Sequence, residues 1–457
     1  MKFNLNNKLR VSKLNYAHNP MFIVIIGFIF IILLGTFFLM LPISNRSGEW
    51  MNPLSALFTA TSATCVTGLT VIDTHSTFTF FGELIILLLI QVGGLGFMSL
   101  AMILMMTFRK KFSFRERFLL SSSLGLDQPG GVLSFVRLSV IGTLIIEGIG
   151  AILLSFFFIP QHGILRGIWL SVFHAISSFC NAGFDILGSG DSLAALKSNG
   201  YILSILMILT IIGGLGFWVW KDLLDYRKKQ RLSLYSKMVL WTTGSLLVFG
   251  TIFYLVAEWN NPQTIGNLSV GDKILNSLFC SVTMRTVGFS TFDIGSLTEP
   301  SKLISTFLML IGGSSGSTAG GIKTVTFLLV VVCAYLTACG RNKVHLHGKT
   351  ISGNDINRAF SLFSIAVGTI LTSTILGCFL DPDAHLLDLL INYTSAFATV
   401  GVAGYTISAM SVFGKILLIA LMFMGRIGVL TITLAIMVRL NRDQDKITYP
   451  KANIFIG

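Results

Sequence analysis

The sequence carries very little charge for its length. Only 12% of its 457 residues are Asp, Glu, Lys or Arg, whereas a soluble globular protein carries about 25%. So few charges cannot cover the surface of a soluble protein of this size. The chain is also 53% hydrophobic and contains 37 Phe, which excludes a disordered protein. The composition therefore indicates a protein that crosses a membrane several times.

Proline and cysteine are scarce as well. Nine Pro stand against 45 Gly with no Gly-x-y period, which excludes a collagen-like chain. The six Cys contain no pair at metal-ligand spacing, and most lie in or near apolar segments. They are expected to act as small hydrophobic residues, not as metal ligands.

Long apolar segments account for most of the chain. A bilayer core of about 30 Å is crossed by about 20 apolar residues in a helix. The segments that meet this length are 21–41, 84–108, 138–159, 201–220, 238–257, 359–380 and 412–438, with an eighth region at 303–338. The sequence therefore predicts an all-α polytopic membrane protein with eight transmembrane helices.

The net charge of +13 follows the predicted topology. Twenty-four of the 33 Lys and Arg residues lie in the two tails and in links 109–137, 221–237 and 341–358, which are separated by even numbers of spans. Cytoplasmic loops carry such an excess. The protein is therefore expected in the cell (plasma) membrane with both termini in the cytoplasm. No nucleic acid is expected as a partner. Contacts with anionic membrane lipids or a cytosolic protein stay open.

A unit of the sequence occurs four times. Between the two spans of each pair lies an amphipathic stretch of about 12 residues, which ends in a small-polar run and a glycine. These glycines are Gly68, Gly183, Gly288 and Gly401. A second landmark follows 24 to 30 residues later, as 91-QVGGLGF-97, 211-IIGGLGF-217, 310-LIGGSSG-316 and 423-FMGRIGV-429. The predicted division is an N-terminal tail 1–17, pore repeats 18–115, 116–232, 233–345 and 346–440, and a C-terminal tail 441–457.

The amphipathic stretches are too short to cross a bilayer and suit re-entrant pore helices. Non-helical backbone at membrane depth is tolerated where it lines a cavity, and its carbonyls can replace the hydration shell of an alkali cation. The carboxyl ends of the four helices also favour a cation. The predicted ion-binding filter comprises Val66, Thr67, Gly68, Asn181, Ala182, Gly183, Thr286, Val287, Gly288, Thr399, Val400 and Gly401. The alternative is that the glycines only permit close helix packing.

These motifs as a set carry a family resemblance. They are 64-TCVTGL-69, 179-FCNAGFD-185, 285-RTVGFS-290, 399-TVGVAG-404, 312-GGSSGSTAGGIK-323 and 424-MGRIG-428. Over residues 15–457 the chain resembles the membrane subunits of the Ktr branch of the Trk/Ktr/HKT superfamily of cation transporters.

The resemblance implies a pseudo-fourfold pore in one chain and K⁺ uptake, commonly stimulated by Na⁺. It also implies a homodimer, with tail 441–457 as a contact, on a cytosolic nucleotide-binding ring formed by a KtrA/KtrC-like RCK protein. In plant HKT relatives a Ser at the first filter position accompanies Na⁺ selectivity. Here that position is Gly68, which favours K⁺.

Region 303–338 is too long for one span, because 36 helical residues would extend about 54 Å. Its middle, 312–322, holds five Gly and four Ser or Thr. The resemblance identifies it as an intramembrane gate loop, and the alternative is a passive kink. The predicted gate residues are Gly312, Gly313, Ser314, Ser315, Gly316, Ser317, Thr318, Ala319, Gly320, Gly321, Lys323 and Arg426.

Three basic residues lie at predicted membrane depth. Arg426 would cost about 2.5–3.5 kcal/mol facing lipid, so we expect it to face an aqueous cavity, repel cations and donate to carbonyls of the gate loop. Arg285 is expected to donate to filter carbonyls or to an outer carboxylate. Lys323 ends the loop and either stabilises it or extends toward the cytoplasm.

Four acids deserve comparison. Glu147 lies in the third span without an obvious partner, and a structural role is the leading interpretation. Asp73, Asp185 and Asp293 each follow a filter stretch. They are expected either to concentrate cations at the outer mouth or to be ordinary solvated loop acids.

Two segments resemble motifs of enzymes, but neither forms a complete site. Segment 312–316 matches G-x-S-x-G, but a nucleophilic Ser needs a nearby base, and only His174 lies at membrane depth. Ile322 interrupts a near match to a P-loop. No enzyme is predicted. The alternative function is a Na⁺- or H⁺-coupled secondary transporter of another solute, which would need intramembrane acids, and only Glu147 qualifies.

Overall fold

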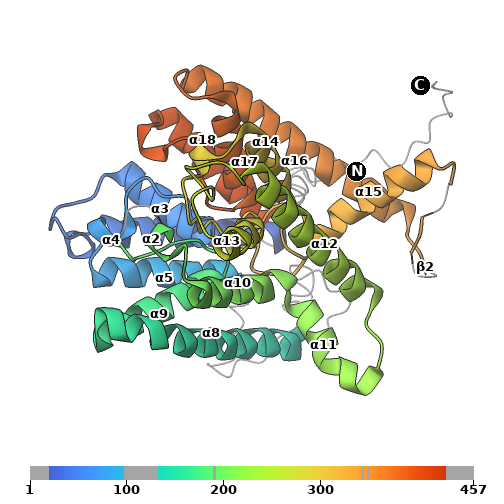
Figure 1. Ribbon diagram of the computed structural model, residues 1–457, viewed down its shortest axis with the longest axis horizontal. Helices are drawn as coiled ribbons and strands as arrows, with labels where there is room; N and C mark the ends of the chain where they lie inside the picture. The colour runs from blue at the N-terminus through green and yellow to red at the C-terminus, as the bar shows by residue number, and fades with distance from the viewer. Residues whose placement is uncertain (1–19, 97–131, 189–191, 342–343, 347–348, 429–457) are drawn as a thin grey trace, which may run out of the picture.

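The computed structural model describes residues 20–96, 132–188, 192–341, 344–346 and 349–428, and almost all ordered segments are helices (Figure 1). The predicted tails 1–17 and 441–457, most of link 109–137, and the carboxyl ends of predicted spans 84–108 and 412–438 lie outside the described residues.

Three helices recur in each repeat. The first is long and apolar, and its copies are α2 (Pro20–Met40), α8 (Val132–His162), α12 (Leu234–Ala257) and α16 (Gly353–Leu380). The second is short, and its copies are α3 (Pro53–Cys65), α9 (Ile164–Phe179), α13 (Val270–Thr283) and α17 (Leu386–Ala398). The third comprises α5 (Phe80–Leu95), α10 (Gly200–Leu215), α14 (Glu299–Leu310) and α18 (Val412–Ile427).

Smaller elements join these helices. They are α4 (Thr74–Thr77), α11 (Phe217–Lys229), α15 (Thr324–Ala338), the 3₁₀ turns η1 (Pro42–Ser44), η2 (Ala194–Leu196), η3 (Ile294–Ser296) and η4 (Ile407–Ala409), and an antiparallel hairpin of β1 (His345–Leu346) and β2 (Lys349–Thr350). The hairpin connects α15 to α16 at one end of the molecule (Figure 1).

Local chemistry accounts for where two of the short helices begin. Asn52 caps α3 by accepting from the backbone N–H of Leu54 at 2.9 Å, and Pro53 fills the first helical position, where no N–H is needed. Ser269 caps α13 by accepting from the N–H of Asp272 at 3.2 Å. Both caps fix the direction in which the chain enters the protein interior.

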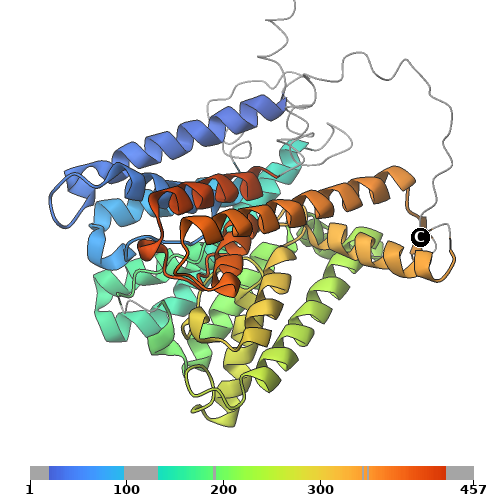
Figure 2. The ribbon, with the colours of Figure 1, turned by 90° about the horizontal axis from the view of Figure 1, so that it is seen from above.

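The short helices are packed in a closed cycle. Each first helix contacts the short helix of its own repeat; for example, α2 contacts α3 and α8 contacts α9. Each third helix contacts the short helix of the following repeat, and these pairs are α5 with α9, α10 with α13, α14 with α17, and α18 with α3. The fourth pair returns to the first repeat, so one chain surrounds a central axis (Figures 1 and 2).

The predicted span 201–220 is not one straight helix. Helix α10 ends at Leu215, and α11 starts at Phe217 after a bend of 92°. Gly216 makes the bend with a φ of 85°, which L residues with a Cβ rarely adopt. Helices α5 and α18 likewise end next to glycines with positive φ, Gly96 at 80° and Gly428 at 90°. Among the described residues, a helix therefore ends at the landmark in every repeat, and not only in the third.

The first glycine of the landmark has a separate packing role. At Gly93, Gly213 and Gly425 a Cβ would collide with the carbonyl at the end of the short helix of the same repeat. The contacted carbonyls belong to Thr64, Phe179 and Phe397. Close contact with these carbonyls therefore requires a glycine at the three landmark positions.

These interruptions shorten the apolar helices. Among the described residues, three helices are long and apolar enough to cross a membrane, namely Phe135–His162, Leu234–Ala257 and Gly353–Leu380, and a fourth if α10 and α11 form one bent span. Helices α2 and α5 contribute shorter apolar segments, Val24–Met40 and Phe80–Leu95.

Candidate functional site

Each short helix is followed by a turn with the same backbone geometry. The turns begin at a residue with positive φ, and these residues are Val66 (56°), Asn181 (60°), Thr286 (81°) and Thr399 (52°). Two residues later comes a glycine with positive φ, and these are Gly68 (93°), Gly183 (68°), Gly288 (91°) and Gly401 (105°). We call residues 66–68, 181–183, 286–288 and 399–401 the Gly turns. They contain all twelve residues predicted to bind an ion.

The Gly turns form a closed ring. The Cα of Gly68 lies so close to the carbonyl oxygen of Ala182 that a Cβ would collide with it. The same relation joins Gly183 to the carbonyl of Val287. The remaining two contacts join Gly288 to Val400 and Gly401 to Thr67. Each glycine thus faces the middle carbonyl of the next turn, so no turn can carry a side chain at this position without displacing its neighbour.

Serine residues support the turns, and the sequence prediction missed them. The Oγ of Ser62 accepts from the N–H of Gly68 at 3.1 Å, and the Oγ of Ser395 accepts from that of Gly401 at 3.0 Å. Ser177 donates from the equivalent position to the carbonyl of Phe184 at 2.8 Å. The signal was available, because a Ser stands six residues before the glycine in three repeats.

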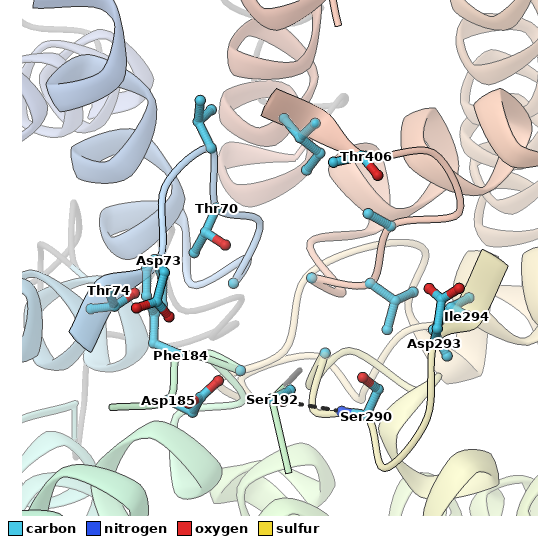
Figure 3. A pocket seen from close by; sticks show the side chains of 18 of the residues that line it. Thr70, Asp73, Thr74, Phe184, Asp185, Ser192, Ser290, Asp293, Ile294 and Thr406 are labelled. Atoms are coloured by element: carbon cyan, nitrogen blue, oxygen red, sulfur yellow. Dashed lines mark hydrogen bonds between the residues drawn. The ribbon is translucent and has the colours of Figure 1, made fainter. Parts of the chain in front are cut away.

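A cavity of about 340 Å³ lies on one side of the ring. All four turn glycines line it, together with segments that follow each turn (Figure 3). Asp73, Asp185 and Asp293 also line it, from repeats 1, 2 and 3. The three acids that the sequence singled out are therefore brought to one mouth.

The three acids differ in their surroundings. Asp73 caps α4 by accepting from the N–H of Ser76 at 2.7 Å, and Asp293 accepts from the hydroxyl of Ser296 at 2.9 Å. Burial raises the pKa of Asp185 to about 6, and the nearby charge of Asp73 also raises it. The ionised form of Asp185 therefore gives the cavity a negative potential, which attracts cations.

A non-helical loop, residues 311–323, lies on the other side of the ring. Its neck is closed by two backbone bonds, from Gly312 N–H to Ile322 at 2.8 Å and from Thr324 N–H to Gly313 at 3.1 Å. The loop contacts residues that start the Gly turns, because Gly320 packs on the Thr399 side chain. The ring therefore separates the cavity from the loop.

The loop fills the break between α10 and α11. A helix that ends leaves its last carbonyls without partners. The N–H of Ser314 donates to Gly214 at 3.1 Å, and the Ser314 hydroxyl donates to Leu215. In return, the N–H of Phe217, the first residue of α11, donates to the loop carbonyl of Gly316 at 3.0 Å. The loop and the bend thus satisfy each other's backbone groups.

Arg426 lies across from the loop, at the end of α18. Its guanidinium donates to the loop carbonyl of Thr318 and to the carbonyl of Gly93, and it donates to Gly94 at 3.2 Å. It therefore joins the loop to the last turn of α5. Lys323 donates from Nζ to the carbonyl of Ala319 at 2.7 Å, so its ammonium closes the loop on itself.

Two further charged residues, Arg285 and Glu147, have different surroundings. The Nε of Arg285 has no hydrogen-bond partner among the described residues, so the expected donation to a carbonyl or carboxylate is absent at this atom. Glu147 does have partners. Its Oε2 accepts from Gln91 Nε2 at 3.1 Å, and the Cys180 thiol lies 3.6 Å from its Oε1. It is held behind the second Gly turn, away from the cavity.

The arrangement suits a monovalent cation. Inward carbonyls can replace a hydration shell, and four helix carboxyl ends add negative potential. Within the part of the chain that the structure describes, no group of three or more His, Cys, Asp or Glu side chains could hold a metal ion.

Comparison with known proteins agrees with this geometry. The family model for TrkH, described as a cation transport protein, matches residues 6–447. The chain is 37% identical to the potassium/sodium uptake protein NtpJ of Enterococcus hirae, over 96% of this chain and 97% of that one. It is 36% identical to the Ktr system potassium uptake protein B of Bacillus subtilis, with the same two coverages.

A solved structure supports the fold. The crystal structure of the potassium transporter TrkH from Vibrio parahaemolyticus superposes with a TM-score of 0.74, at 16% identity, and covers 93% of this chain and 86% of that one. Family model, relatives and structure agree over nearly the whole chain. The chain is an integral membrane protein that belongs to the TrkH family of cation transport proteins.

Proposed function

We propose that the chain takes up K⁺ through a K⁺-selective, channel-like pore whose filter is the ring of Gly turns. The observation that carries the proposal is the closed contact of each turn glycine with a carbonyl of the next turn. Such a ring fixes the carbonyl positions, and fixed carbonyl dipoles can distinguish K⁺ from Na⁺. The relatives named as potassium or potassium/sodium uptake proteins support the choice of ion.

The 311–323 loop is proposed as the gate. It contacts Asn181 and Thr399, which start the second and fourth Gly turns, and Arg426 adds a positive charge beside it. A Gly-rich loop that is held mainly by hydrogen bonds can leave its place when entering water takes over those bonds. When it and Arg426 withdraw, the path beneath the ring opens.

The assembly is proposed from the relatives. Three are named as uptake proteins of Ktr systems, which supports control by a separate cytosolic nucleotide-binding RCK ring. We also propose eight spans with four re-entrant helices, both termini in the cytoplasm, a homodimer, and stimulation by Na⁺. The 340 Å³ cavity is then the extracellular mouth.

A coupled secondary transporter is less well supported. It would need an acid on the pathway that changes its charge during transport. Glu147 is the intramembrane acid singled out by the sequence, and its carboxyl contacts Gln91 and Cys180 instead of lining the cavity. The geometry therefore favours passive conduction.

Uptake of ⁸⁶Rb⁺ into proteoliposomes tests the proposed function. Uptake should proceed down a K⁺ gradient without a Na⁺ or H⁺ gradient, and a tenfold excess of K⁺ should reduce it much more than an excess of Na⁺. Addition of Na⁺ should raise the rate. Absolute dependence on a Na⁺ or H⁺ gradient would instead establish the coupled transporter.

Gly68→Ser tests the filter. The new Cβ collides with the Ala182 carbonyl and adopts an unfavourable φ of 93°, so carbonyls of two turns must shift. We expect the K⁺/Na⁺ uptake ratio to fall about tenfold, which equals about 1.4 kcal/mol of discrimination. The control is Gly271→Ser, at a helical position where a Cβ meets nothing within 4 Å. An unchanged ratio in Gly68→Ser would argue against the filter.

Two variants test the gate. Deletion of residues 314–319 and Arg426→Ala should each raise basal ⁸⁶Rb⁺ flux several-fold, because both remove the hydrogen bond at Thr318. Lys415→Ala, which removes a cation at the other end of α18, should leave the flux unchanged. Size-exclusion profiles verify folding. Flux at or below the level of the unaltered protein in both gate variants would contradict the gate.

External pH tests the charged mouth. Because the pKa of Asp185 is raised to about 6, the carboxyl is ionised at pH 7.5 and largely neutral at pH 5.5. At a subsaturating K⁺ concentration, this change should lower uptake on the order of threefold. Asp185→Asn should remove the pH step and give the low rate at both values, whereas Asp293→Asn should keep the step. A full step in Asp185→Asn would refute the assignment.

A further inference from the structure

Thr318 is the point at which the loop bonds directly to a Gly turn. Its hydroxyl is fully buried and lies 3.1 Å from the Phe179 carbonyl and 3.1 Å from Oδ1 of Asn181. Its N–H donates to Gly213 at 3.4 Å, and its carbonyl accepts from Arg426. Every polar group of Thr318 therefore has a hydrogen-bond partner, and its hydroxyl points toward the second Gly turn.

The contact continues to the third turn. Asn181 Nδ2 donates to the hydroxyl of Thr286 at 3.3 Å. Side-chain hydrogen bonds thus run from Thr318 through Asn181 to Thr286, from the loop across two neighbouring turns. All three residues are at most 1% exposed, so water does not compete for these bonds.

The two turn residues on this path hold unfavourable backbone conformations. Asn181 has a φ of 60°, which Asn tolerates, whereas Thr286 has a φ of 81°, which is rare for a β-branched residue. Such conformations persist only where the surroundings hold them. Loss of the Thr318 hydroxyl removes one of the groups that hold Asn181, and through it Thr286.

The other two turns lack an equivalent polar connection to the loop. Gly320 packs on Thr399, and the Thr399 hydroxyl has no hydrogen-bond partner among the described residues. The first turn starts with Val66, which has no polar side-chain atom. Any effect of the loop on the ring therefore passes mainly through repeats 2 and 3.

We propose that Thr318 is a positioning residue that couples the 311–323 loop to the ion-coordinating turns. The position of the loop then sets the K⁺/Na⁺ preference as well as the flux. With the loop in place, Thr318 holds Asn181 and Thr286. When the loop withdraws, the carbonyls of turns 2 and 3 are held less firmly and discriminate less. The inference rests on the proposed gate and filter and adds a connection between them.

Thr318→Val tests the coupling, because it removes the hydroxyl and keeps the shape of the side chain. We expect basal ⁸⁶Rb⁺ flux to rise and the K⁺/Na⁺ uptake ratio to fall about fivefold, the effect of one lost hydrogen bond. Thr318→Ser should restore the ratio. Lys415→Ala, which removes a cation at the other end of α18, should leave both the flux and the ratio unchanged.

A double-mutant cycle with Asn181→Ala separates coupling from independent effects. If Thr318 acts through Asn181, Thr318→Val adds nothing to the loss of ratio caused by Asn181→Ala. Thr318→Ala offers a second deletion of the hydroxyl if the valine variant does not fold. A higher flux with an unaltered ratio in both hydroxyl deletions, or fold-changes that multiply in the cycle, would overturn the coupling. The deletion of residues 314–319 would then still test the proposed gate, and Gly68→Ser would still test the proposed filter.

Discussion

Backbone N–H and C=O groups at membrane depth must have partners, and the structure depends on how this requirement is met. Helices α5, α10 and α18 end next to glycines and leave carbonyls that lipid cannot satisfy. At α10 the partners are donors of the 311–323 loop, and at α5 the partner is the Arg426 guanidinium. The interruptions, the loop and the buried cation are therefore parts of one arrangement. Removal of one leaves polar groups of the others unpaired.

The fourfold pattern is strict in the turns and relaxed around them. The turn glycines share their φ range and their contact with the next carbonyl. Repeat 3 departs behind the turn, where Val282 stands in place of the supporting serine and Arg285 in place of Cys65, Cys180 or Ala398. Its third helix also lacks the landmark contact that Gly93, Gly213 and Gly425 make, and Gly312 packs on Gly320 of the loop instead. The repeat that provides the loop is thus the one whose local supports differ.

The sequence allowed prediction of the features that occur once in each of the four repeats. Gly68 and its three counterparts could be found because a φ that excludes side chains leaves a glycine at a fixed spacing. The break at Gly216 was missed because 201–220 is apolar throughout, and hydropathy does not report a bend. The partners of Glu147 and the path from Thr318 to Thr286 could not be predicted, since they join residues more than 30 positions apart through side-chain geometry. Arg285 was expected to donate to filter carbonyls or to an outer carboxylate, but its Nε has no hydrogen-bond partner among the described residues.

The covalent joining of four repeats has a consequence for symmetry. A tetramer of identical subunits would carry four copies of the 311–323 loop and four copies of Arg426 around one axis. There is room there for one loop, because the single copy already contacts α10, Arg426 and the starts of two Gly turns. A single gene product that contains all four quarters lets one quarter specialise while the ring stays regular. Internal duplication followed by divergence is therefore an evolutionary route to a regular ring that carries one asymmetric loop.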